Sequence, residues 1–137
     1  MNLKIRTGPE PRTLFVSGAV SAGTAVMIGA FGAHGLRSAL PGDMLAIFET
    51  GVRYQMYHAF ALLATSWAAA QWGSRLPRSV AASGWFFGLG TIFFSGSLYI
   101  LSITGIGWIG AMTPIGGVLF IAGWITLGYS AWKGARR

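Results

Sequence analysis

The chain has no cysteine and only three acidic residues among its 137 residues. The lack of cysteine excludes disulfides, thiolate nucleophiles, iron–sulfur clusters and cysteine-ligated zinc. Glu10, Asp43 and Glu49 are outnumbered by ten Lys and Arg, so the formal net charge is +7 and the pI is near 10.9. In a water-soluble protein this balance would indicate nucleic-acid binding.

Charge of either sign is scarce in this chain, which is 53% hydrophobic and only 9% charged, with a mean hydropathy of +0.58. A water-soluble core cannot bury that much apolar surface. The basic residues also avoid the apolar stretches and collect between them, as they do in membrane proteins. We therefore expect the lipid bilayer, and no nucleic acid, as the partner of this chain.

Apolar stretches long enough to cross a membrane occur four times. A bilayer core about 30 Å thick needs about 20 apolar helical residues, and the stretches cover about 13–35, 54–72, 81–103 and 114–132. Residues 44–52 suit either a short interfacial helix or an extension of the second span. Thr113 and Pro114 suit the start of the fourth span. The sequence predicts one all-α domain, a multi-pass bundle of four transmembrane helices.

The distribution of basic residues predicts the orientation of the chain. One side of the predicted bundle has Lys4, Arg6, Arg12, Arg75, Arg78, Lys133, Arg136 and Arg137. The other side has Arg37 and Arg53, which Asp43 and Glu49 offset. Since basic loops stay in the cytoplasm, both termini should be cytoplasmic. A cleaved signal peptide is the alternative for the first span, although this apolar run is longer than is usual for one.

Small residues form a stripe on the first and third spans. Small side chains let membrane helices approach closely, so these stripes should face other helices or a second copy of the chain. The predicted packing positions are Gly18, Ala22, Ala25, Gly29 and Gly32, then Gly84, Gly88, Thr91 and Ser95. The stripes superpose at an offset of 66 residues. An internal repeat and coincidence both remain explanations of that offset.

Polar residues gather near the predicted outer ends of the first two spans, and they form the candidate site. Ionisable groups at membrane depth are costly and mark functional hypotheses. Glu49 and Arg53 have the spacing of a helical ion pair, and the Tyr54 hydroxyl could reach His58 on one helix face. The candidate polar cluster consists of His34, Glu49, Arg53, Tyr54, Tyr57 and His58.

This cluster has three interpretations. His34, Glu49 and His58 could form a two-histidine, one-carboxylate metal site or a proton relay. The two histidines could also ligate haem. The third interpretation is a set of hydrogen bonds that ties helices together, which the lack of a closely spaced histidine pair favours. We therefore expect no metal and no cofactor, and no catalytic residue is assigned.

Four segments then resemble the domain-of-unknown-function 423 family, which is similar to the animal transmembrane protein 256. They read GAFGAHGL at 29–36, FETGVRYQMYHA at 48–59, FSGSLY at 94–99 and GAMTPIGG at 110–117. The resemblance covers about 17–132 in the order of the family. It implies a four-helix protein of the bacterial inner membrane and transfers no catalytic role or cofactor to any residue.

Three classes of function follow. The leading hypothesis is a non-enzymatic small partner or stabilising subunit of a membrane assembly, because lipid-buried glycine faces favour helix contacts and no nucleotide-binding or hydrolase motif is present. The second is an oligomeric transporter or channel for a small solute or ion. A single copy of this chain has few intramembrane charges that could line such a pathway, so this hypothesis requires an oligomer. The third is a membrane enzyme or cofactor binder that uses His34, Glu49 and His58.

Overall fold

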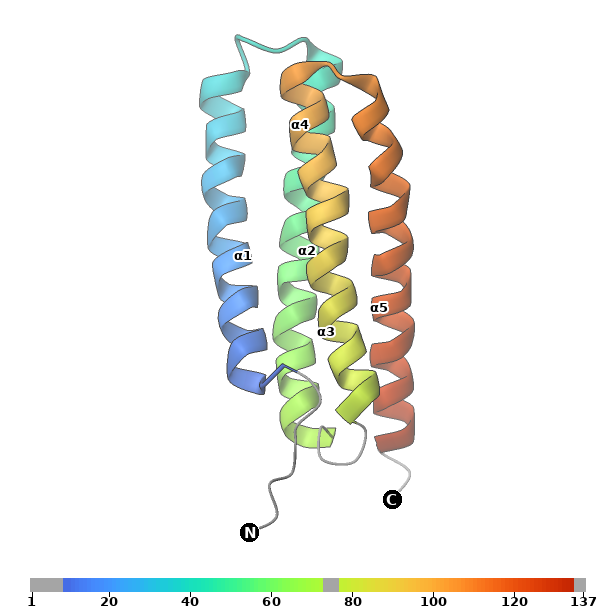
Figure 1. Ribbon diagram of the computed structural model, residues 1–137. Helices are drawn as coiled ribbons and strands as arrows, with labels where there is room; N and C mark the ends of the chain where they lie inside the picture. The colour runs from blue at the N-terminus through green and yellow to red at the C-terminus, as the bar shows by residue number, and fades with distance from the viewer. Residues whose placement is uncertain (1–8, 73–76, 135–137) are drawn as a thin grey trace.

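The computed structural model describes residues 9–72 and 77–134, and this part of the chain is helical without any strand. The helices lie side by side along a common direction, and α1 starts at the same end of the bundle at which α5 ends (Figure 1). The elements are α1 (Pro11–Phe31), a π-helical turn (Gly32–Leu36), α2 (Gly42–Trp72), α3 (Pro77–Thr91), a second π-helical turn (Ile92–Gly96), α4 (Ser97–Thr104), a 3-10 turn (Gly107–Met112) and α5 (Thr113–Gly134). The fold class is therefore all-α, as predicted.

Consecutive helical elements form continuous rods, and three of these rods in the described residues are long and apolar enough to cross a membrane. They are Pro11–Leu36, Arg78–Thr104 and Gly107–Gly134. The third predicted span thus consists of α3, the second π-helical turn and α4, and it ends at Gly105, whose φ of 70° suits a glycine at a helix C-terminus. Gly105 and Ile106 lie outside any helix, and α5 begins at Thr113 with Pro114 next, as the sequence predicts.

α2 is not among the apolar rods, because Gln55, His58 and Gln71 interrupt its hydrophobic sequence. It is nevertheless the central helix, since it packs against α1, α3, α4 and α5. A helix surrounded by protein can direct its polar groups at its neighbours rather than at lipid. α2 therefore contains the predicted second span, 54–72, but it begins earlier, at Gly42, and it is more polar than the three apolar rods.

Residues 44–52 belong to α2 and do not form a separate interfacial helix. Phe48 is only 2% exposed, and its ring fills the space beside Gly32, where an added Cβ would come within 2.7 Å of the ring. The same ring lies 5.0 Å from that of Tyr99, measured between centroids. This segment is held in the bundle because its apolar side chains have helical partners.

Glycines receive aromatic rings where the helices meet. A Cβ added at Gly123 would come within 2.6 Å of the Phe87 ring, and one added at Gly90 would come equally close to Phe120. Both rings are buried. α3 and α5 can therefore approach closely because each helix lacks a side chain where the other inserts a ring.

Hydroxyl pairs link the two apolar rods Arg78–Thr104 and Gly107–Gly134 along their length. Three pairs of side-chain oxygens lie within hydrogen-bond distance, namely Ser79 and Ser130 at 2.8 Å, Ser83 and Thr126 at 2.9 Å, and Ser97 and Thr113 at 2.7 Å. Interhelical hydroxyl bonds are a common way to join membrane helices.

The predicted small-residue stripes lie mostly between helices. In α1 and the turn that follows, Gly18, Ala25 and Gly32 are buried and Ala22 and Gly29 are half-buried; in the third rod, Gly84 and Ser95 are buried and Gly88 and Thr91 are half-buried. The two most closely packed helix pairs are α1 with α2 and α3 with α5. The internal repeat stays a prediction. Five of the cations used to predict the orientation, Lys4, Arg6, Arg75, Arg136 and Arg137, lie outside the described residues.

Candidate functional site

His58 occupies the middle of α2 and is the buried ionisable group of the predicted cluster, with 4% of its surface exposed. Its Nδ1 lies 2.7 Å from the Tyr54 carbonyl oxygen, and its Nε2 lies 3.3 Å from the indole nitrogen of Trp124 on α5. A carbonyl can only accept and an indole N–H can only donate. Nδ1 must therefore donate and Nε2 must accept, which defines one neutral tautomer with both nitrogens occupied.

Aromatic rings surround the imidazole of His58. It stacks on Phe120 with 3.3 Å between centroids and 2° between planes, and Phe87 lies 5.8 Å away. Phe87 and Trp124 form an edge-to-face pair at 5.0 Å. The imidazole belongs to α2 and these rings belong to α3 and α5, so the imidazole is a polar contact point at the junction of three helices.

Gln55 on α2 connects this helix with α1 and α4 and is 7% exposed. Its amide nitrogen donates to the Ser21 carbonyl at 3.0 Å and to the Thr24 hydroxyl at 2.9 Å, both on α1. Its amide oxygen accepts a 2.8 Å hydrogen bond from the Tyr99 hydroxyl on α4. Both ends of the amide are therefore used, and α1, α2 and α4 are joined through one side chain.

The second π-helical turn, at Ile92–Gly96, lies beside this network. Ser95 in the turn is 1% exposed and donates a 2.7 Å hydrogen bond to the Gly51 carbonyl of α2. Gly51 also faces Tyr99, whose ring would lie 2.8 Å from a Cβ added there. The extra residue of a π turn changes which side chains face the neighbouring helix, and here it accompanies the contact between Ser95 and α2.

The structure does not bring the predicted metal ligands together. His34 lies exposed in the first π-helical turn, Glu49 is exposed on α2, and His58 is buried. Glu49 and His58 are separated by about 13 Å along one helix at 1.5 Å per residue. No group of three His, Cys, Asp or Glu that could hold a metal ion occurs within residues 9–72 and 77–134.

The other members of the predicted cluster also have different partners from those expected. The Arg53 guanidinium donates to the Thr50 hydroxyl at 3.2 Å rather than to Glu49. Tyr54 contributes its carbonyl, not its hydroxyl, to His58, and its ring stacks on Phe94 at 4.5 Å. Tyr57 is 55% exposed and packs edge-on against Tyr54. Of the six residues, only Tyr54, Tyr57 and His58 form one connected set.

Gln55, Tyr99 and Trp124 were absent from the predicted site. A signal for Gln55 was present, because a glutamine inside an apolar span needs an interior partner. Nothing in the sequence indicated that Trp124 and His58 face each other. That contact depends on how α2 and α5 are rotated.

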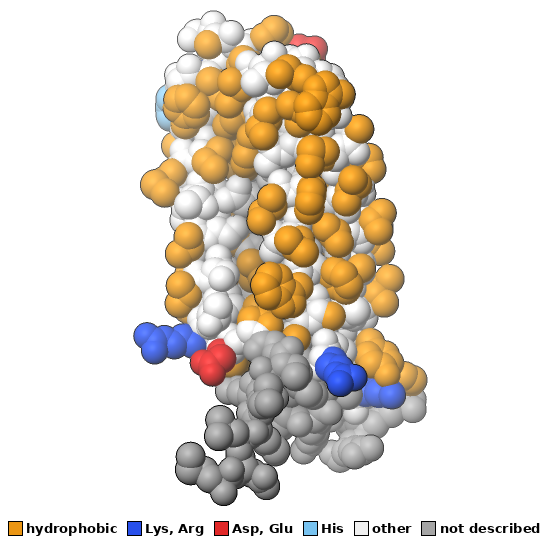
Figure 2. Space-filling view, in the orientation of Figure 1, with side chains coloured by type: hydrophobic (Ala, Val, Ile, Leu, Met, Phe, Trp, Pro, Cys, Tyr) orange, Lys and Arg blue, Asp and Glu red, His pale blue; other side chains and the backbone are white. Residues whose placement is uncertain are grey.

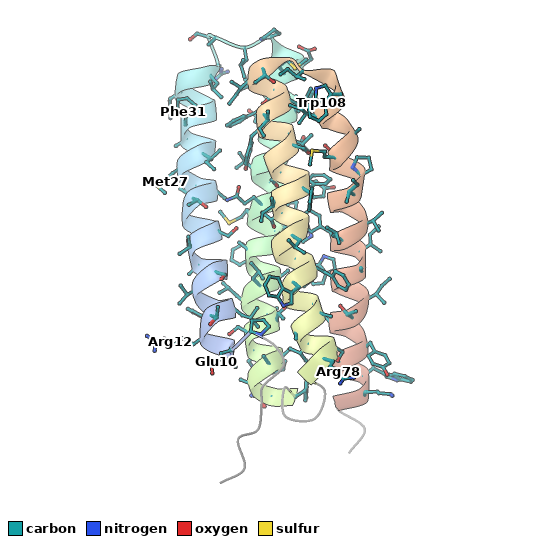
Figure 3. All side chains as sticks on the ribbon, in the orientation of Figure 1. Glu10, Arg12, Met27, Phe31, Arg78 and Trp108 are labelled. Atoms are coloured by element: carbon teal, nitrogen blue, oxygen red, sulfur yellow. The ribbon has the colours of Figure 1, made fainter. Side chains whose placement is uncertain are left out.

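The fold and its interior define a class, a helical membrane protein whose buried polar groups are satisfied by contacts between helices. In the described residues, no buried side-chain nitrogen or oxygen lacks a hydrogen-bond partner. The outward-facing side chains are large and apolar, as Met27, Phe31 and Trp108 illustrate in Figure 3.

The chain belongs to the family described as a protein of unknown function, DUF423, which matches residues 28–117. It is 44% identical to a membrane protein of Bacillus subtilis, UPF0382 membrane protein YwdK, over 89% of this chain and 98% of the relative. A UPF0382 membrane protein of Staphylococcus saprophyticus is 45% identical with the same coverage. One of Haemophilus influenzae is 42% identical over 79% of this chain and 84% of the relative. No solved structure matches the chain.

The family match includes Gln55, His58 and Tyr99 but ends before Phe120 and Trp124. The relatives from Bacillus and Staphylococcus match over 122 residues. The chain is therefore a membrane protein of this family.

Proposed function

We propose that this protein is a four-span protein of the bacterial inner membrane and serves as a small, non-enzymatic partner or stabilising subunit of a membrane assembly. Both termini lie in the cytoplasm. The observation that carries the subunit role is the incomplete packing of α1, which packs mainly against α2 and makes no comparable contact with α3, α4 or α5.

The four-span topology is supported by the geometry of α2. This helix contains 31 residues, which corresponds to about 46 Å at 1.5 Å per residue, and a bilayer core is about 30 Å thick. α2 runs between the ends of three rods that are apolar enough to cross a membrane. With four spans, α1 starts and α5 ends on the same side, where Arg12, Arg78 and Lys133 lie.

Reporter fusions test the orientation. A reporter that is active only in the cytoplasm and one that is active only in the periplasm would each be fused after Arg137 and within residues 73–78. We expect cytoplasmic signals at both positions, because basic segments are retained on that side. A periplasmic signal at either position contradicts the proposed topology.

The space beside Gly88 is where we place a partner helix. Gly88 follows Gly84 by about one helical turn. Gly84 faces α1, because a Cβ added at Gly84 would lie 2.6 Å from the Leu14 side chain. An atom added at Gly88 would meet nothing within 4 Å, so the face of α3 that turns towards α1 stays open there. An open glycine between two membrane helices can admit the backbone of a third helix.

The buried polar groups support a structural role for the interior. Both nitrogens of His58 and both ends of the Gln55 amide are used in contacts between or within helices. A catalytic or ligand-binding role for either side chain would require breaking these contacts. The interior therefore serves to hold the helices in register.

The subunit role is tested by native mass spectrometry of the protein extracted from its own membrane in lipid nanodiscs, with metal analysis of the same sample. We expect a complex with a second membrane protein. Gly88→Leu should decrease the fraction of complex, whereas Gly128→Leu on α5, where an added Cβ also meets nothing within 4 Å, should leave it unchanged. The free energy of unfolding of both variants should stay within about 0.5 kcal/mol of that of the original chain or rise slightly.

A monomer alone or a homo-oligomer alone overturns the subunit role. A complex that tolerates Gly88→Leu as well as Gly128→Leu overturns the placement of the partner helix beside Gly88. A homo-oligomer would direct work to flux measurements in liposomes, and a stoichiometric metal ion would contradict the structural role of the interior.

A further inference from the structure

The end of the bundle at which α3 begins and α5 ends has a concentration of cations. Arg12, Arg78 and Lys133 are exposed there, and Glu10 is the one acidic residue of the chain near this end, because Asp43 and Glu49 lie at the other. Figure 2 shows the basic side chains of this face at the lower end, below the hydrophobic side chains of the helices, and Figure 3 labels Arg12 and Arg78 at that level.

Two of these cations share a corner of the bundle. The hydroxyls of Ser79 on α3 and Ser130 on α5 lie 2.8 Å apart, which fixes the two helices against each other at this level. Arg78 directly precedes Ser79, and Lys133 follows Ser130 by three residues, so it lies on a neighbouring part of the same helix surface. Both side chains are exposed.

Aromatic side chains border the same corner. The Lys133 ammonium lies 5.1 Å from the centroid of the Tyr129 ring, and Trp132 is 55% exposed. Tyrosine and tryptophan prefer the boundary between headgroups and acyl chains. The corner thus combines two exposed cations with the aromatic side chains of Tyr129 and Trp132.

We propose that the corner formed by Arg78 and Lys133 binds the phosphate of an anionic phospholipid. A guanidinium can hold two phosphate oxygens at once, and an ammonium beside it adds a second positive charge. The acyl chains of the lipid then pack against Tyr129 and Trp132, a contact that a free phosphate ion cannot make. This inference rests on one part of the proposed function, namely that the helices cross the membrane and this end of the bundle therefore lies among the lipid headgroups.

The test is lipid binding measured by native mass spectrometry of the purified full chain in detergent, with phosphatidylglycerol titrated against phosphatidylcholine. We expect the original chain to retain phosphatidylglycerol selectively. The double variant Arg78→Gln, Lys133→Gln should bind it about 25-fold more weakly, at about fivefold for each cation removed. The matched variant Arg37→Gln, Arg53→Gln removes two cations from the opposite end and should change binding by less than about twofold.

Several outcomes overturn the proposal. Equal retention of both lipids, an unchanged affinity in the Arg78 and Lys133 variant, or an equal loss in the Arg37 and Arg53 variant would each show that no site exists at this corner. Displacement of the lipid by an equal concentration of inorganic phosphate would identify a free anion, not a lipid, as the ligand. The single variants then separate the two cations, and a Lys133→Arg variant should retain binding.

This experiment is independent of the tests of the proposed function. Reporter fusions can place this end on either side of the membrane, and a chain without a protein partner can still retain the lipid. A loss of lipid selectivity with intact topology and assembly would therefore overturn this inference alone.

Discussion

Replacing Gly116 by alanine should destabilise the bundle because the close contact there is with backbone. A Cβ added at Gly116 would collide with the Phe94 backbone nitrogen and would lie 2.8 Å from the Phe94 Cα and 2.7 Å from its Cβ. Carbon atoms attract each other best at about 3.5–4.0 Å. Relief of the overlap therefore requires α5 to move away from the second π-helical turn by about 1 Å.

The expected loss in the free energy of unfolding is worked out by comparing Gly116→Ala with Gly128→Ala on the same helix. Gly128 has open space where the new methyl group would lie, so this substitution adds helix propensity without a collision. Both variants gain the same propensity, about 1 kcal/mol, which cancels when they are compared. The difference that remains is the cost of overpacking, about 1–3 kcal/mol, and contact with backbone places it at the upper end.

The assay is unfolding in mixed micelles of a mild detergent and dodecyl sulfate, followed by circular dichroism. We expect Gly116→Ala to unfold at a lower dodecyl sulfate fraction than the original chain and Gly128→Ala at an equal or higher one. If Gly116→Ala is as stable as Gly128→Ala, the close approach of α5 to Phe94 is not a feature of the folded protein.

Two further predictions concern the buried polar groups. Gln55→Leu should lower the free energy of unfolding by about 1–3 kcal/mol, because the Tyr99 hydroxyl loses its partner inside the bundle, whereas the exposed Gln71→Leu should change it by less than about 0.5 kcal/mol. Equal stability of the two leucine variants would contradict the network around Gln55. His58→Phe keeps a ring against Phe120 but loses both hydrogen bonds, so the same unfolding assay should show a loss of about 1–2 kcal/mol, and an unchanged midpoint would show that stacking alone holds this junction.

The positions of most helices could be predicted because they depend on local properties of the chain. The apolar run at 13–35 begins in the structure at Pro11, and Thr113 with Pro114 begins α5 as expected. A proline in the first turn of a helix acts locally and needs no distant partner. The role of residues 44–52 could not be decided in this way, because the pattern of a surface helix and that of a buried helix end are the same until Phe48 meets Gly32.

The candidate site was predicted less well because proximity in sequence was taken for proximity in space. Glu49, Arg53 and His58 share a helix, but Glu49 and Arg53 are exposed whereas His58 is buried and lies about 13 Å from Glu49 along the axis. The residues that His58 does meet, Phe120 and Trp124, are more than 60 positions further along the chain. Gln55 has the clearest interior role among the polar residues. It lies within the same segment, 48–59, but it was not selected because its side chain is not ionisable.

The sequence by itself determined that this is a helical membrane protein whose cations lie mostly outside its apolar runs, because apolar run length, helix breakers and charge spacing are properties of short segments. It also determined the family. Only the tertiary structure decided which polar groups meet, for example the Trp124 indole with the His58 imidazole and the Tyr99 hydroxyl with the Gln55 amide. Those contacts depend on the rotation and depth of each helix against its neighbours, and these are set by the glycines that receive aromatic rings across the helix interfaces.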